Sequence, residues 1–195
     1  MKTGLTILFG FILSTFWACN TLSTPDQTTL IDNIKADQSL TNFESKFIVD
    51  TASVLLNRNL DTLLKDLENN ELTEQNEITK IPNFIKVFLE NSTDDHFSIG
   101  NPGENWQVTD VVMDKLPTRQ LVYLGLSDNI VLLTYYSGGI GKSEHILILK
   151  HNNKQILDFW SGNVLTDLTT KNEIVNYLKA NKYKKWGLNT NIITF

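Results

Sequence analysis

The sequence has one cysteine, Cys19, and only 4 prolines among its 195 residues. A chain with a single thiol cannot form an internal disulfide, so no disulfide framework holds the fold together. The sequence also lacks an excess of positive charge, because 17 Lys and Arg residues face 22 Asp and Glu residues. Nucleic-acid binding needs a basic face that neutralises phosphates. Nucleic acid is therefore not an expected partner.

No apolar run is long enough to span a bilayer comfortably, since a transmembrane helix needs about 20 apolar residues. The longest run, "GLTILFGFILSTFWAC", follows the single charge of Lys2 and ends at Cys19. A charged start, an apolar stretch of about a dozen residues and a small residue before a cleavage point are typical of a secretory signal peptide. We therefore expect residues 1–18 to be removed and take no part in the fold.

The end of this signal, Phe16-Trp17-Ala18-Cys19, resembles the lipobox of bacterial lipoproteins. In that family the cysteine thiol receives a diacylglyceryl group, signal peptidase II cuts before it, and the new N-terminus is acylated, as with palmitate. The family prefers Leu and a small residue where this chain has Phe16 and Trp17. The resemblance implies a lipid-anchored protein on a bacterial membrane, at the outer membrane or cell surface if the cell has two membranes.

The alternatives for this segment are an uncleaved membrane anchor and an ordinary secretory signal. Phe16 fits an ordinary secretory cut poorly, because that cut needs small residues at both flanking sites. If Cys19 carries lipid, two or three acyl chains at about 0.8 kcal/mol per buried methylene would hold the protein on the membrane. The polar residues 19–27 then act as the lipidated cysteine and its tether, and residues 28–195 form a single domain.

Helical spacing of apolar residues dominates the first half of this domain, and strand patterns dominate the second half. The predicted helices cover 28–39, 41–67 with a break near 57–59, 82–90 after Pro82, and 170–181 after a capping box of Thr170 and Glu173. The predicted strands cover 106–113, 119–126, 130–136, 143–150 and 155–160, and residues 187–195 suggest an added edge strand.

The links between these strands are short, which favours an antiparallel meander. Asp128-Asn129 and Asn152-Asn153 stand where hairpin turns need residues that tolerate positive φ. In 130–136 and 143–150 both alternating faces are apolar, so these strands should be covered on two sides or curl around a core. We expect an α+β fold in which N-terminal helices pack on a bent antiparallel meander sheet of about five strands, with a C-terminal helix.

The stretch "YYSGGIGKS" ends in Gly-Lys-Ser, but it does not meet the requirements of a phosphate-binding loop. Such a loop needs Gly five residues before Gly141, where this chain has Tyr136, and a helix must follow Ser143. The residues after Ser143 alternate as a strand. No nucleotide and no other cofactor is therefore expected. The glycines are interpreted as a loop between strands that needs positive φ or a close backbone approach.

A glycine-rich loop with aromatic neighbours can also border a binding surface, because aromatic rings combine apolar area with a polar group. The candidate ligand-binding residues lie in this loop and in the flanking strands. They are Tyr135, Tyr136, Gly138, Gly139, His145 and Trp160.

Acid–base or metal chemistry has only weak support. Asp95 and His96 lie in a polar loop, and Glu144 adjoins His145, whose side chain should point to the opposite face of a strand. No metal site and no catalytic residue is assigned from these pairs. We therefore expect a non-catalytic domain, anchored in the envelope by its lipid, that binds another envelope protein or a small apolar or glycan ligand.

Two other interpretations stay open. The first is a hydrolase that acts on cell-envelope material with Asp95 and His96, or Glu144, as acid and base. The second is a scaffold without a small ligand, which would have a large exposed apolar patch and no cleft. The sequence identifies no reaction.

Overall fold

A meander of antiparallel strands forms the centre of the fold. The structure, a computed structural model, describes residues 47–93, 96–110, 115–139 and 141–183. The meander runs through β3 (Arg119–Leu126), β4 (Ile130–Ser137), β5 (Ser143–His151) and β6 (Ile156–Val164). These strands confirm four of the five strands of the predicted meander, and the last one continues to Val164 rather than ending near Trp160.

Two short strands complete the sheet, which has six strands in the described part of the chain. β1 (Thr73–Gln75) pairs antiparallel with the end of β3, and β2 (Ile99–Gly100) pairs parallel with its beginning. β1 and β2 therefore lie at one edge of the sheet, and β6 forms the other edge. With four α-helices among the described residues, the fold class is mixed α+β, as predicted.

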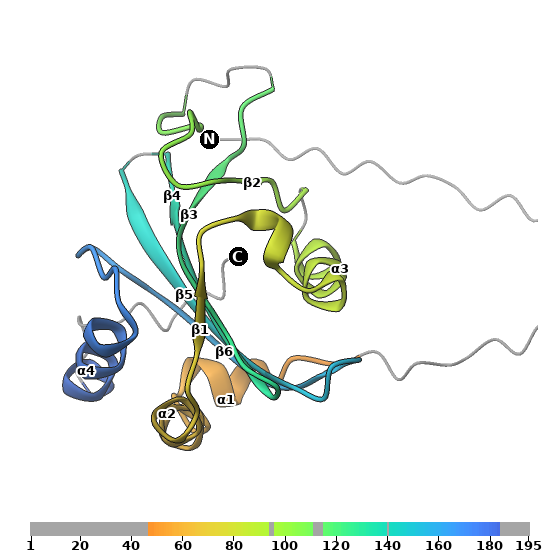
Figure 1. The fold of residues 1–195 in the computed structure, drawn as a ribbon. Helices are drawn as coiled ribbons and strands as arrows, with labels where there is room; N and C mark the ends of the chain where they lie inside the picture. The colour runs from red at the N-terminus through yellow and green to blue at the C-terminus, as the bar shows by residue number, and fades with distance from the viewer. Residues whose placement is uncertain (1–46, 94–95, 111–114, 140, 184–195) are drawn as a thin grey trace, which may run out of the picture. The chain divides into compact units, whose positions relative to one another are not determined.

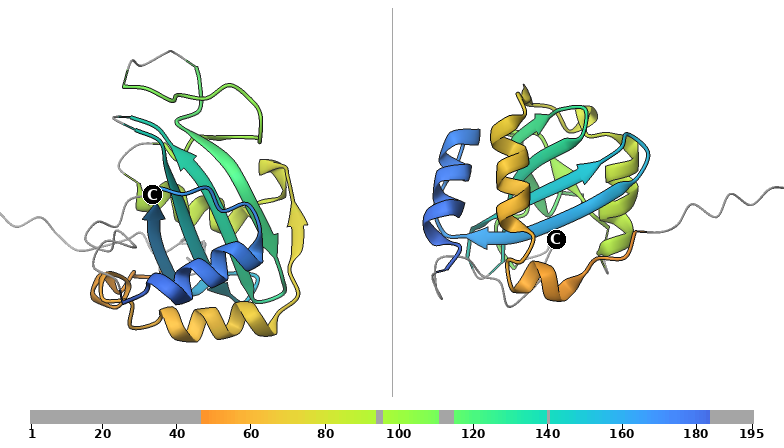
Figure 2. Two further views of the ribbon diagram at one scale, coloured as in Figure 1. Left: turned by 90° about the vertical axis from the view of Figure 1, so that its left-hand side faces the viewer. Right: turned by 90° about the horizontal axis from the view of Figure 1, so that it is seen from below.

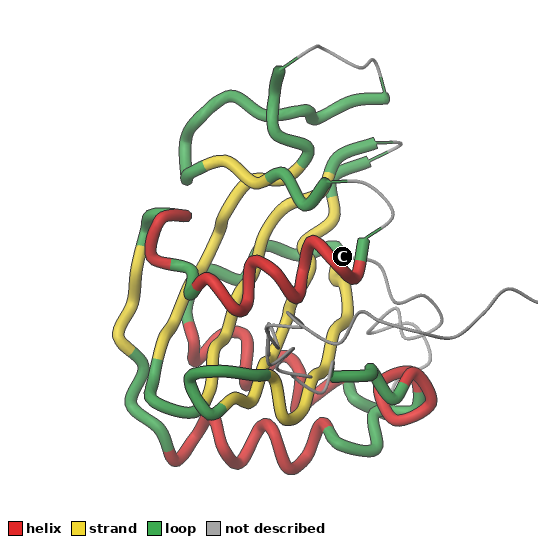
Figure 3. The backbone as a smooth tube through the Cα atoms, turned by 90° about the vertical axis from the view of Figure 1, so that its right-hand side faces the viewer, coloured by secondary structure: helices red, strands yellow, loops and turns green. Residues whose placement is uncertain are grey.

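Helices cover both faces of this sheet. α2 (Leu60–Asn69) and α4 (Lys171–Asn181) lie on one face, as Figure 2 shows, and α3 (Asn83–Ser92) lies on the other (Figures 1 and 3). The short α1 (Thr51–Leu55) adjoins β6. We refer to the two sides as the α2/α4 face and the α3 face. The two-sided cover explains why β4 and β5 are apolar in both alternating positions.

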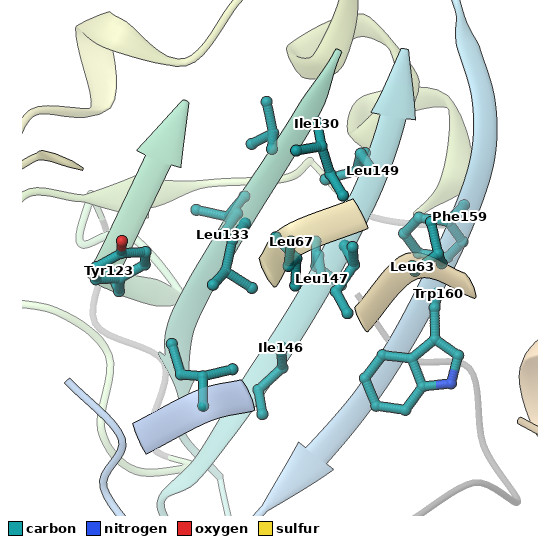
Figure 4. Packing of buried hydrophobic residues seen from close by; sticks show 14 of the residues in the cluster. Leu63, Leu67, Tyr123, Ile130, Leu133, Ile146, Leu147, Leu149, Phe159 and Trp160 are labelled. Atoms are coloured by element: carbon teal, nitrogen blue, oxygen red, sulfur yellow. The ribbon is translucent and has the colours of Figure 1, made fainter. Parts of the chain in front are cut away.

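Specific residue pairs connect the helices to the sheet on each face. On the α2/α4 face, Lys150 of β5 forms an ion pair of 2.7 Å with Asp66 of α2. On the α3 face, the ring of Phe88 lies 5.3 Å from the ring of Phe159 of β6. The apolar stripe of α2 is buried at Leu60, Leu63, Leu64 and Leu67, and part of it packs on β4 and β5 in Figure 4. Full burial of each such leucine contributes roughly 1.5–3 kcal/mol.

The local signals at the helix ends act largely as the sequence predicts. Thr170 and Glu173 form a complete capping box at the start of α4. The predicted break near 57–59 separates α1 from α2, and Asn57 has a φ of 54° there. Its side chain accepts a 2.9 Å hydrogen bond from Trp160 Nε1 and donates one to the carbonyl of Lys182. Asn57 therefore ties the turn to β6 and to the end of α4.

Some predicted elements differ in the structure. Residues 47–50 are not helical, because Asp50 caps α1 instead of a helix continuing from 41. Residues 106–110 are not a strand: Gln107 N donates to Pro117 O, and Val108 O accepts from Gly139 N, so their hydrogen bonds go to loops. Asn153 has the expected positive φ of 67°, whereas Asp128 and Asn129 do not. The predicted helix at 28–39 and tail strand at 187–195 lie outside the described residues.

Candidate functional site

An apolar cleft opens beside α3, where the 3-10 helix η1 (Ile78–Lys80) and β2 approach it. It has a volume of about 260 Å³. Figure 3 shows α3 in front of the sheet, and the cleft lies along this helix. We name it the α3 cleft, and its lining residues are Ile78, Ile81, Lys86, Leu89, Glu90, Phe97, Ser98 and Ile99.

The walls of the α3 cleft belong partly to the hydrophobic core. Ile81 and Leu89 are buried, and Phe97 and Ile99 are partly buried against the same cluster. The charged lining residues are Lys86 and Glu90, one helical turn apart on α3. Neither forms an ion pair with a residue that the structure describes. Apolar walls with a few polar groups are the usual form of a small-ligand site.

Behind the Phe97 wall lies a second layer of aromatic and polar side chains from the central strands. The Arg119 guanidinium lies 4.7 Å from the Phe97 ring centroid, and the Tyr135 ring meets Phe97 edge-on at 5.4 Å. Tyr135 in turn stacks on His145 at 5.2 Å with an interplanar angle of 8°. Burial raises the pKa of the Tyr135 phenol, so it stays protonated at any physiological pH.

Tyr135 and His145, two of the predicted ligand-binding residues, therefore lie together on the α3 face, as register partners on β4 and β5. They support the Phe97 wall rather than line the cleft themselves. His145 is 6% exposed, and its Nε2 lies 3.2 Å from Ser143 Oγ. A serine nucleophile also needs an oxyanion site beside it, so this pair alone does not define a catalytic centre.

Tyr136 belongs to a different group on the α2/α4 face, at the end of β4. Its ring stacks on Trp106 at 6.3 Å, and Lys142 Nζ lies 4.0 Å from its ring centroid. Lys142 also forms a 2.7 Å ion pair with Asp167. This pairing holds the pKa of the Asp167 carboxyl below, and that of the Lys142 ammonium above, their ordinary values. We name Trp106, Tyr136, Lys142 and Asp167 the strand-end cluster.

Glu144, the residue proposed as acid or base in the hydrolase interpretation, lies behind the strand-end cluster and is 1% exposed. Its Oε2 accepts a 2.7 Å hydrogen bond from the backbone N–H of Leu168. Burial raises the pKa of Glu144 from an ordinary 4.5 to about 7, although this hydrogen bond acts in the opposite direction. Glu144 thus fixes the link between β6 and α4.

The two predicted glycines of the loop have different roles: Gly138 makes room for backbone, and Gly139 has a positive φ. A Cβ on Gly138 would lie 2.4 Å from Gln107 O and 2.6 Å from Val108 O. Gly139 has a φ of +127° and donates its N–H to Val108 O at 3.2 Å. A side chain at Gly138 would displace segment 106–110. The loop thus provides the close backbone approach that the sequence predicts.

Trp160, the last predicted ligand-binding residue, is fully buried on the α2/α4 face, where its indole N–H donates to Asn57. It lies on β6, on the face opposite to Tyr135 and His145. The predicted residues therefore do not share one surface. Two lie behind the α3 cleft, while Tyr136 and Trp160 lie on the other side of the sheet.

Other predicted positions do not line the cleft or lie outside the described residues. Cys19 and Asp95 lie outside the described residues. His96 is exposed in the loop before β2, and its carbonyl accepts a 2.7 Å hydrogen bond from Ser98 N. Among the described residues, no three His, Cys, Asp or Glu side chains gather as a metal site. In the same residues, no helix has the length and apolar character needed to cross a membrane.

Comparison with known proteins adds no assignment: no family model, no curated protein and no solved structure matches this chain. The site must therefore be interpreted from its own residues.

The residues that line the α3 cleft were not singled out from the sequence. Helical spacing after Pro82 is consistent with the burial of Ile85 and Leu89, which are fully buried on α3. Lys86 and Glu90 follow on the same helix as ordinary surface charges. The sequence gives no signal for β2, which forms part of the cleft, because a strand of two residues has no recognisable period.

Proposed function

We propose that this protein is an exported, lipid-anchored binding protein of a bacterial envelope, whose ligand places an apolar group in the α3 cleft. The observation that carries the proposal is the cleft itself, with about 260 Å³ between apolar walls and charged side chains at one helix. Apolar walls give affinity through removal of surface from water, and a few polar groups fix the orientation of the ligand.

The lipid anchor is supported by the resemblance of the signal peptide to that of bacterial lipoproteins. The anchor would determine where the protein binds its ligand. A protein tethered through Cys19 works at the membrane surface, in the outer membrane or on the cell surface if the cell has two membranes. Among the ligand classes considered, an apolar group fits the cleft better than a sugar. Among the described lining residues, Ser98 is the one with an uncharged polar side chain, whereas a sugar needs several hydrogen-bond partners.

Binding agrees with the geometry better than hydrolysis. Glu144, whose carboxyl has a pKa raised to about 7, is 1% exposed and already accepts a hydrogen bond from the Leu168 N–H. A general acid must reach the atom that it protonates. Of the groups that the hydrolase interpretation needs, the described residues Glu144 and His96 do not line the α3 cleft.

The proposal is tested by filling the cleft. The change is Ile78→Trp in the otherwise complete chain, measured by titration with an environment-sensitive apolar dye such as 1-anilinonaphthalene-8-sulfonate. Ile78 is partly buried in the cleft wall, so the larger ring should occupy the ligand's space and weaken dye binding at least tenfold. The control is Val87→Trp, which adds the same bulk to the exposed side of α3 and should leave dye binding unchanged.

Two results would contradict the proposal. The unaltered protein would fail to bind the dye, or both tryptophan variants would bind it as well as the unaltered protein does. Circular dichroism of each variant shows whether the fold is kept. A loss of fold in Ile78→Trp alone would move the test to Ser98→Phe, because Ser98 lines the same cleft.

A further inference from the structure

We propose that the ligand of the α3 cleft is a free α-amino acid with an apolar side chain. This inference rests on the proposed function and adds the chemical class of the ligand. It follows from the placement of two opposite charges, those of Lys86 and Glu90, beside a small apolar space that has Phe97 in its wall.

The charges of the cleft come from one face of α3. Lys86 and Glu90 are four residues apart, so their Cβ atoms lie about 5–6 Å from each other. They do not pair with each other or with another described residue. The order Lys before Glu is also the weaker one for pairing within a helix. Both side chains are therefore available to an occupant of the cleft.

An occupant that satisfies both charges must carry a carboxylate and an ammonium close together. The α-carboxylate of an amino acid would meet the Lys86 ammonium, and its α-ammonium would meet the Glu90 carboxylate. A ligand with one charge would leave the second cleft residue unmatched. The end of a peptide offers only one of the two groups, and an internal peptide residue offers neither.

The size of the cleft limits the rest of the ligand. Sites for drug-sized ligands have volumes of about 300–1,000 Å³. With about 260 Å³, the α3 cleft is just below this range. It therefore suits a single apolar side chain, such as a phenyl or branched aliphatic group, against Leu89, Phe97 and Ile99. A lipid with two long acyl chains would not fit.

The experiment compares three probes that share a phenyl group and differ in charge. They are L-phenylalanine, 3-phenylpropionate and 2-phenylethylamine, and each is titrated into the complete chain by isothermal titration calorimetry. We expect phenylalanine to bind at least tenfold more tightly than either singly charged probe. Lys86→Gln should reduce phenylalanine binding to about the level of the amine, and Glu90→Gln should reduce it to about the level of the carboxylate.

The controls are Lys80→Gln and Glu77→Gln, which remove exposed charges near η1 that do not line the cleft. They should leave all three affinities unchanged. Equal binding of the three probes, or a preference for a singly charged probe, would overturn the amino-acid inference and leave the apolar cleft standing. Dye binding without binding of any of the three probes would have the same meaning. Failure of the dye itself would instead overturn the proposed function.

Discussion

At the scale of single residues, Glu144 shows how burial changes the role of a charged side chain. In the sequence it adjoins His145 and resembles half of an acid–base pair. In the structure it faces the α2/α4 side and holds the N–H of Leu168. Its Oε1 and the nearby hydroxyl of Thr134 are buried without a hydrogen bond of ordinary geometry. The neutral, protonated form of Glu144 avoids the cost of burying a negative charge at this site.

This arrangement predicts a defined pH dependence of stability. The pKa of Glu144 is about 7 in the folded state against an ordinary 4.5, so between these values the folded protein keeps a proton that the unfolded chain releases. The contribution of Glu144 is fully present below about pH 4.5. The free energy of unfolding should therefore fall by about 3 kcal/mol as the pH rises from 4.5 to 7, and then level off.

Glu144→Gln isolates this contribution. The amide keeps an acceptor for Leu168 N and has a permanent donor for Thr134, so the variant should lose this part of the pH dependence and exceed the unaltered protein in stability at pH 8. Urea denaturation at pH 5 and pH 8 measures both effects. If the two proteins had parallel pH profiles, a buried neutral Glu144 would be excluded.

At the scale of elements, the glycine-rich loop between β4 and β5 makes a structural connection. Gly138 admits the backbone of segment 106–110 and Gly139 has a φ of +127°, while Gly141 has nothing within 4 Å of the place where its Cβ would be. The same short motif therefore contains one glycine with a steric role, one with a conformational role and one with neither. The resemblance to a phosphate-binding loop ends there, since β5 and no helix follows.

Alanine substitutions in this loop should separate these roles. Gly138→Ala places a methyl group within 2.6 Å of two carbonyl oxygens, so we expect a loss of about 2–4 kcal/mol of stability and a red shift of Trp106 fluorescence as segment 106–110 moves away. Gly141→Ala is the matched control, with an expected change within about 0.5 kcal/mol. Thermal unfolding followed by tryptophan fluorescence measures both variants. Equal behaviour of the two would show that segment 106–110 does not pack on Gly138 in solution.

The longer elements were predictable from the sequence because their residues follow one period over many positions. β3 alternates over most of its length, β4 and β5 are continuous runs rich in apolar residues, and α4 has its own capping box. β1 and β2 were not predictable, because strands of two or three residues are decided by the neighbour that they pair with. The strand predicted at 106–110 does not form for a related reason: the backbone of this segment bonds to loops and finds no strand to pair with.

At the scale of the whole molecule, the apolar character of both faces of β4 and β5 predicted either a two-sided cover or a sheet curled around a core, and the structure has the two-sided cover. The candidate site was harder to predict. Tyr135 and Tyr136 are adjacent, so strand alternation sends them to opposite faces, and no shared surface follows from their proximity in sequence. The α3 cleft forms where η1, α3 and β2 meet, and only the pairing of β2 with β3 brings Ile99 to α3.

In the proposed function, a lipid tether on Cys19 decides where this cleft works. The most direct test is the intact mass of the protein purified from the membrane fraction of its host, compared with a Cys19→Ala form. We predict a mass equal to residues 19–195 plus acyl chains, and no such species for the variant. An unmodified mass for the unaltered protein would contradict the lipid anchor and leave Cys19 a free thiol.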